Sequence, residues 1–98
     1  MALRVLSVSE VHSTAETSAA TLTLDITKDT STNAPGAGVS VLSATANLKS
    51  AANTVQTPAL SATAANLVLA AGDRLSMVPS AAGTQSAGVL VTVHMARA

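Results

Sequence analysis

The segment TLTLDIT, residues 21–27, alternates strictly between apolar and polar side chains. Leu22, Leu24 and Ile26 fall on one face of an extended chain, and the intervening Thr and Asp side chains fall on the other. A period of two is typical of a strand with one buried and one hydrated face, and it does not fit a helix. The segment therefore predicts a half-buried β-strand and favours an all-β fold.

Similar alternation recurs near both ends of the chain. Residues 89–95 predict a last strand with one apolar face: Val89, Val91, Val93 and Met95. Its second face is only half polar and is a candidate subunit interface: Leu90, Thr92 and His94. Residues 1–12 predict a first strand, or an arm on a neighbouring subunit. Its apolar side chains are candidate contacts and lie on both faces, with Leu3 and Val5 on one and Leu6 and Val8 on the other.

The remaining segments are short and separated by turn residues. We expect a strand around Val39 and Val41, exposed loops at residues 27–38 and 79–88, and a short strand at residues 53–57. Ser61 or Thr63 is expected to cap one helical turn, and a short α-helix at residues 43–53 is the alternative to further β-structure. This spacing predicts one all-β domain, residues 1–98, folded as an antiparallel β-sandwich or barrel with at most one short helical turn.

The composition limits how well such a sandwich can stand alone. Of the 98 residues, 48% are hydrophobic, yet none is aromatic and none is Cys. Aromatic side chains each bury about 150–250 Å², so the core must be thin, and disulfides and thiolate metal sites are excluded. A thin core in a small domain is commonly supplemented by partner chains. We therefore expect a homo-oligomer.

The charge pattern argues against several classes of partner. Five acidic and five basic residues give a net charge of zero, whereas nucleic-acid binding requires a basic surface. The basic residues are scattered, so we expect no nucleic-acid partner and no membrane partner. Polar residues interrupt the N-terminal segment, which therefore does not resemble a signal peptide. We expect the chain to be made in a cytoplasm and kept there or released by lysis.

Residues that could support chemistry are few. Glu10 and His12 share a face if the chain is extended there, and Glu16 adds one more carboxylate, which falls short of a metal site. A trimer could gather three copies of His94, but a surface or interface histidine is the favoured interpretation for both histidines. A small Ser-His-Asp hydrolase stays open as a combinatorial alternative, although the chain has no Gly-x-Ser-x-Gly motif. We expect no catalytic, cofactor-binding or metal-binding residues and no cofactor.

The stretch AAGDRLSMV, residues 70–78, contains the remaining candidate, Asp73. Gly72 permits a turn there, and Asp73 can accept hydrogen bonds from local backbone N–H groups. We expect Leu75 and Met77 to enter the core, with Arg74 and Ser76 facing outwards. Asp73 is therefore predicted to start a strand and not to act in chemistry.

The same stretch supports a family resemblance. Residues 67–98, LVLAAGDRLSMVPSAAGTQSAGVLVTVHMARA, resemble the C-terminal part of small bacteriophage virion proteins, in which an L-x-L-A-A-G-D-R-L run precedes a Gly/Thr/Ser-rich loop and a final A-G-V-x-V-T-V strand. Residues 52–67, ANTVQTPALSATAANL, fit the same pattern, and the N-terminal half is less diagnostic. The Gly-Asp start of residues 72–78 also resembles trimeric jelly rolls of the tumour-necrosis-factor type, at the level of fold alone.

The resemblance implies an antiparallel, jelly-roll-like β-sandwich and a non-enzymatic structural protein of the virion. The expected role is a capsid decoration or cement protein, most simply a homotrimer, that binds the major capsid protein on the outer surface of shells assembled in the bacterial cytoplasm. The alternative is a fibre, spike or tail-surface domain that recognises the host through loops 27–38 and 79–88, expected together at one end.

Overall fold

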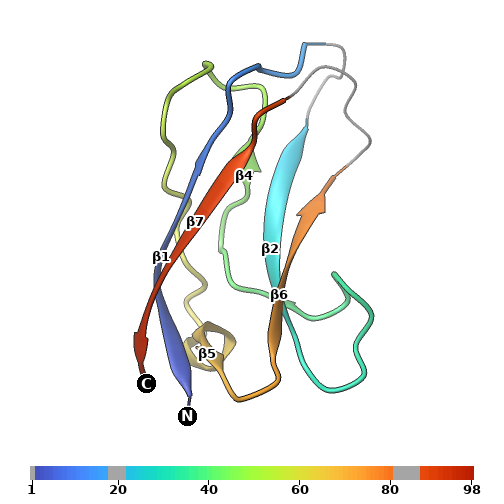
Figure 1. Cartoon of the computed structure of the whole chain (residues 1–98), viewed down its shortest axis with the longest axis vertical. Coiled ribbons are helices and arrows are strands. Elements are labelled where there is room, and N and C mark those ends of the chain that lie inside the picture. Colours follow the sequence, from blue (N-terminus) through green and yellow to red (C-terminus); the bar gives the residue numbers. More distant parts are fainter. Residues whose placement is uncertain (1, 18–21, 81–86) are drawn as a thin grey trace.

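The computed structural model describes residues 2–17, 22–80 and 87–98 of the chain and shows an antiparallel β-sandwich (Figure 1). One sheet has the order β5-β1-β7. In the other, β2 is hydrogen-bonded to β3 and β4 along one edge and to β6 along the opposite edge. The all-β sandwich predicted from the alternating segments is confirmed.

The elements follow the sequence in the order β1 to β7, with a single 3-10 turn among the described residues. The long strands are β1 (Leu3–Val11), β2 (Thr23–Asp29), β6 (Arg74–Pro79) and β7 (Leu90–Arg97). The short elements are β3 (Val39–Ser40), β4 (Ala46–Asn47), the 3-10 turn η1 (Ala64–Leu67) and β5 (Val68–Leu69). Both chain termini lie at the same end of the sandwich (Figure 1). Within the described residues no helix is long and apolar enough to cross a membrane.

The hydrophobic core lies between the two sheets, and its buried apolar side chains are all aliphatic. Leu22, Leu24 and Ile26 are all buried, as the alternation in residues 21–27 predicts, although Thr21 lies outside the described residues. One core cluster gathers residues from both sheets: Val5, Val8, Ile26, Val41, Leu42 and Leu69. A smaller cluster lies towards the end of the sandwich that is opposite the chain termini: Leu22, Leu24, Ala46 and Leu48. Each buried Leu or Val stabilises the fold by about 1.5–3 kcal/mol relative to an exposed one.

Strand β1 departs from simple alternation because it contains a β-bulge. Its register with β7 shifts between Val5, opposite Met95, and Ser7, opposite His94. Leu6 is the extra residue, and it projects outwards with 49% of its surface exposed. The bulge resets the alternation, so Val5 and Val8 face the same core although three positions separate them. The prediction of opposite faces for Val5 and Val8 is therefore wrong.

Several predictions of buried residues and of secondary structure are wrong, most of them at the edges of the sheets. Val41 is buried, but Val39 is 46% exposed. Leu75 packs against the core, whereas Met77 is 58% exposed although it lies opposite Ile26. Residues 53–57 contribute only an isolated bridge at Gln56. Residues 43–53 form β4 and turns instead of a helix, while the single helical turn is confirmed as η1.

The two predicted loops lie at opposite ends of the β2–β6 pair. Asp29, where the first loop begins, is opposite Arg74 at the start of β6. Leu24, at the other end of β2, is opposite Pro79, where the second loop begins. Antiparallel pairing thus places residues 30–38 and the described start of the second loop, Pro79 and Ser80, at opposite ends, and the expectation that the loops share one end is wrong. Residues 81–86 of the second loop lie outside the described residues.

Candidate functional site

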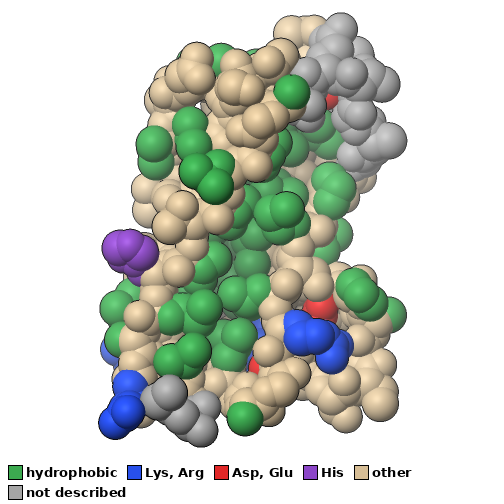
Figure 2. Space-filling model, viewed as in Figure 1, with side chains coloured by type: hydrophobic (Ala, Val, Ile, Leu, Met, Phe, Trp, Pro, Cys, Tyr) green, Lys and Arg blue, Asp and Glu red, His purple; other side chains and the backbone are tan. Residues whose placement is uncertain are grey.

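The sandwich is open along one side, between the edge strands β6 and β7. Strand β7 pairs with β1, and β6 pairs with β2, so each is the last strand of its sheet on this side. Figure 2 shows apolar side chains gathered in a band along this side of the molecule. We call this surface the open seam, formed by inward-facing residues of the two edge strands: Leu75, Met77, Val91, Val93 and Met95.

Register explains why these side chains face the core side yet remain partly exposed. Met77 lies opposite the buried Ile26, and Met95 lies opposite the buried Val5, so each methionine shares the inner face of its sheet. No strand is hydrogen-bonded beyond them on this side, and 58% of Met77 and 39% of Met95 is exposed. The seam is therefore core-facing surface that this chain does not cover with its own described residues.

One end of the open seam deepens into a hollow of about 370 Å³. Its apolar walls come from four elements: Leu3, Leu69, Leu75 and Met95. The turn at residues 70–73 forms its rim, where the Asp73 carboxylate accepts a hydrogen bond from the Ala70 N–H at 2.8 Å and Gly72 has a φ of +90°. The predicted local role of Asp73 is thus what the geometry shows. The hollow itself was not foreseen, because it depends on strands far apart in the sequence.

A second exposed surface covers the outer face of the β1–β7 pair. We call it the β7 face, formed by Leu6, Leu90, Thr92 and His94. The structure thus brings together four of the seven contact residues predicted from the sequence. Leu90 is 59% exposed, and Leu6 lies at the bulge beside His94.

The other three predicted contact residues lie elsewhere. Val5 and Val8 are each 1% exposed in the core, so a partner docking on the folded domain cannot reach them. Leu3 lines the hollow at the end of the open seam. Strand β1 is the middle strand of its sheet and pairs with β7 from Leu3 to Val11. Residues 3–11 therefore belong to this domain's own sheet and not to a free arm.

Glu10 and His12 form a buried ion pair. His12 Nδ1 lies 2.9 Å from a Glu10 carboxylate oxygen, and neither side chain is more than 1% exposed. His12 Nε2 donates to the Ser50 carbonyl at 2.8 Å. Gln56 Nε2 donates to the same carboxylate at 2.6 Å and to the Asn47 carbonyl at 2.7 Å. The pair thus fastens residues 47–56 to β1.

The surroundings of His12 favour its charged form. Burial lowers the pKa of His12, but the Ser50 carbonyl and the Glu10 carboxylate outweigh burial and raise it above 6.5. Both ring nitrogens face hydrogen-bond acceptors, an arrangement that the doubly protonated ring satisfies and that leaves neither nitrogen facing a substrate. The expectation of a surface or interface histidine is wrong for His12, whereas His94 is exposed on the β7 face.

Asp29 anchors the loop that joins β2 to β3. Its carboxylate accepts hydrogen bonds from the Ser76 and Thr27 hydroxyls and from the Gly36 and Gly38 N–H groups. These donors, with the Ser76 hydroxyl the strongest, lower the pKa of Asp29 to about 2. A Cβ on Gly38 would lie 1.8 Å from the Lys28 carbonyl oxygen, which explains why a glycine stands there. Asp29 is structural, and sequence patterns gave no signal of its burial.

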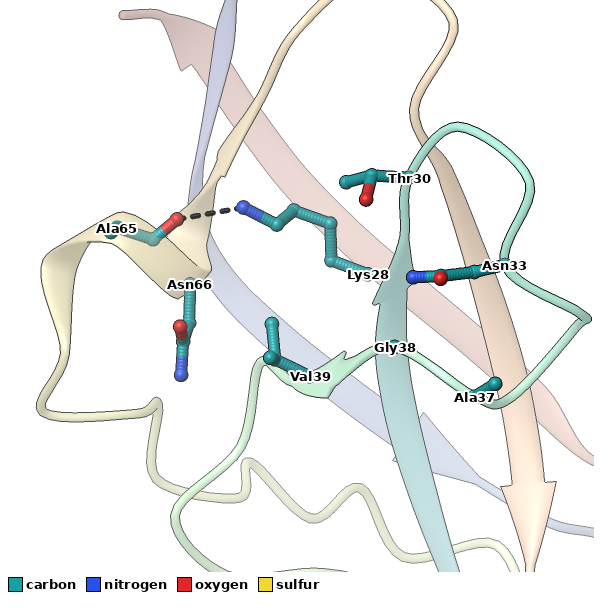
Figure 3. Close-up of a pocket in the computed structure, with 8 residues that line it drawn as sticks. All are labelled: Lys28, Thr30, Asn33, Ala37, Gly38, Val39, Ala65 and Asn66. Carbon is teal, nitrogen blue, oxygen red and sulfur yellow. Dashed lines mark hydrogen bonds between the residues drawn. The ribbon is translucent and has the colours of Figure 1, made fainter.

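The same loop borders a second hollow, of about 350 Å³ and with a mixed polar and apolar lining (Figure 3). Lys28, Thr30, Asn33 and Asn66 contribute its polar side chains. Lys28 Nζ donates to the carbonyls of Ala65 and Val68 at 2.8 and 2.9 Å, so its charge holds η1 and β5 against β2. The part of the chain that the structure describes brings no three His, Cys, Asp or Glu side chains together as a metal site. Comparison with protein-family models, with curated proteins and with solved structures finds no match to this chain.

Proposed function

We propose that this chain is a non-enzymatic structural protein of a bacteriophage virion. It decorates the outer surface of the assembled capsid as a homotrimer, binds the major capsid protein and stabilises the shell. The observation that carries the proposal is the pair of uncharged, apolar surfaces on either side of β7, the open seam and the β7 face. Exposed apolar surfaces of this kind mark sites of protein association.

Composition supports a role among many protein neighbours. Only 10% of the residues are charged, which suits a surface covered by other chains better than one exposed on a free monomer. The surface is rich in small Ala, Ser, Thr and Val side chains, which lose little conformational entropy on contact. Weak contacts repeated by capsid symmetry add up to strong attachment, because each bound copy presents the next contact at high local concentration.

The mechanism of stabilisation follows from mass action. A protein that binds the assembled shell, and not the dissociated capsid subunits, shifts the equilibrium towards the shell. At a free concentration 100 times its Kd, each site contributes about 2.7 kcal/mol. The effect requires a copy number that matches the capsid lattice.

The test counts the copies of this protein in each virion, using virions purified from a bacterial host in which phage carrying the gene has multiplied. Quantitative mass spectrometry is expected to find hundreds of copies per particle. Particles grown from a deletion mutant are expected to lose their DNA at a lower temperature, and added purified protein is expected to restore the wild-type temperature. Virions that lack the protein, or deletion particles with unchanged thermal stability, would overturn the proposal.

A host-recognition domain on a fibre or spike is the second candidate. The hollow of about 350 Å³ beside loop 30–38 favours it, because hollows of about 300–1,000 Å³ with a few polar groups suit small ligands (Figure 3). Aromatic rings, which commonly stack on sugars, do not occur in the chain. A copy number of a few to a few dozen per virion, with loss of host adsorption in an Asn33→Ala, Asn66→Ala variant, would support this candidate instead.

A further inference from the structure

The open seam and the β7 face are two different surfaces on the same chain: one contains a hollow and the other carries projecting apolar side chains. The seam is concave, with its hollow of about 370 Å³, while Leu6 and Leu90 project from the β7 face with 49% and 59% of their surfaces exposed. Four of the six large apolar side chains that are exposed in the described residues belong to these two surfaces: Leu6, Met77, Leu90 and Met95.

The two surfaces also match in length and charge. Val91 to Met95 along the open seam and Leu90 to His94 along the β7 face each cover five residues, or about 13 Å of extended chain. The seam residues named above carry no formal charge, and the β7 face contains only His94 as a titratable group. Contact between them therefore opposes no like charges and buries no unpaired formal charge if His94 is neutral or stays at the rim.

The edge of β7 gives a further reason to expect a neighbour. Its sequence, LVTVHMAR, has no Pro, no Gly and no formal charge before Arg97. Natural edge strands are ordinarily protected by charged side chains, Pro or bulges, because an open apolar edge promotes aggregation. An eight-residue edge of this composition is expected to be covered in the functional assembly.

We propose that a second copy of this chain covers the open seam, inserting its β7 face, with Leu6 and Leu90, against Leu75, Met77 and Met95. The contact is head-to-tail, because each copy gives one surface and receives the other. Head-to-tail contacts form a closed ring when the rotation between copies permits it. This contact describes how the subunits of the proposed homotrimer meet. It rests on the proposed function for the number of subunits, three.

The test uses three variants of the full chain. A face variant carries Leu6→Asp and Leu90→Asp, and a seam variant carries Met77→Asp. The control is Val55→Asp, which changes an apolar residue that is 63% exposed but belongs to neither surface. Far-UV circular dichroism and cooperative urea unfolding establish that each variant is folded, and Met77→Lys replaces Met77→Asp if the latter does not fold.

Native mass spectrometry and light scattering then give the oligomeric state. We expect trimers for the wild type and the control, and monomers for the face and seam variants. A mixture of the two variants is expected to form a 1:1 complex, because the intact face of the seam variant fits the intact seam of the face variant. Head-to-tail contact alone predicts this rescue.

Four results would overturn the proposal. They are a wild type that stays monomeric, variants that remain trimeric, a control that dissociates as the variants do, and a mixture that forms no complex. A wild type that is monomeric in solution yet abundant on virions would leave decoration standing and assign the seam to the capsid. A trimer that is absent from virions would instead overturn decoration and leave the head-to-tail contact standing.

Discussion

At the scale of single residues, the buried polar groups determine how the loops are held. Asp29 is buried and receives four hydrogen bonds, two from side-chain hydroxyls and two from the backbone of loop 30–38. Arg74 Nη2 also donates to the Asn33 carbonyl of that loop at 2.7 Å. One carboxylate and one guanidinium thus fix a loop that contains few apolar residues to pack.

Asp29→Asn is expected to lower the free energy of unfolding and to make that free energy depend less on pH between 2 and 6. The folded pKa of about 2 lies below the ordinary value of 3.8, so this carboxylate stabilises the fold fully above about pH 4. Its contribution is lost as the pH falls towards 2. Urea unfolding measured from pH 2 to 6 checks this, with the exposed Asn33→Ala as control. An Asp29→Asn variant whose acid dependence matched the wild type would contradict the role of Asp29.

His12→Gln is expected to destabilise the fold and to alter its response to alkali. The pKa of His12 is raised in the folded state, so its charged form stabilises the fold below about pH 6.5, and this contribution is lost as the pH rises through the folded pKa. Weakening the buried pair costs about 1–3 kcal/mol, because Glu10 keeps its bond from Gln56 but loses its charged partner.

Urea unfolding of the His12→Gln variant from pH 6 to 9 is the measurement. The other charged groups near the network are Glu16 and Lys49, whose Nζ donates to the Glu16 carbonyl at 3.3 Å. His94→Gln is the control, since that histidine is exposed on the β7 face. If the free energy of unfolding lost its dependence on pH between 6 and 9 in His94→Gln and kept it in His12→Gln, the assignment to His12 would be wrong.

At the scale of elements, the bulge in β1 decides which side chains enter the core. Deleting Leu6 is expected to leave the fold intact, because Val5, Ser7 and Val8 would then alternate regularly opposite Met95, His94 and Val93. Deleting Ser9 is expected to be far more damaging, since it moves Val8 to the outer face. Cooperative unfolding of the two deletion variants compares them, and equal loss of stability in both would contradict the proposed role of the bulge.

The sequence predicts which segments form strands better than it predicts which side chains are exposed at the sheet edges. Alternation located Leu22, Leu24 and Ile26 in the core, because β2 is flanked by strands on both sides and its inner face is covered. The same rule failed for Met77, since exposure at an edge strand depends on what lies beside it and not on its own pattern. The ion pair depends on distant residues, because Ser50 lies 38 residues from its partner His12 and Gln56 lies 46 residues from its partner Glu10. No local sequence pattern predicts such contacts.

At the scale of the whole molecule, a thin core and an open seam imply that association and stability are linked. If copies cover each other's seams, the folded chain is stabilised by its own concentration, because the unfolded chain does not form the contact. For a trimer, each tenfold increase in concentration adds on the order of 1 kcal/mol per chain. A change of that size raises the Tm of a domain of 60–100 residues by about 4–8 °C.

Differential scanning calorimetry over a hundredfold range of protein concentration measures this link directly. The Tm of the wild type is expected to rise with concentration, whereas the Tm of Met77→Asp is expected to stay constant, since its seam no longer accepts a neighbour. Val55→Asp is expected to follow the wild type, because that side chain lies outside both surfaces. A wild-type Tm that does not depend on concentration would mean that the thin aliphatic core is sufficient for a stable monomer. The exposed methionines of the seam would then need a partner other than this chain.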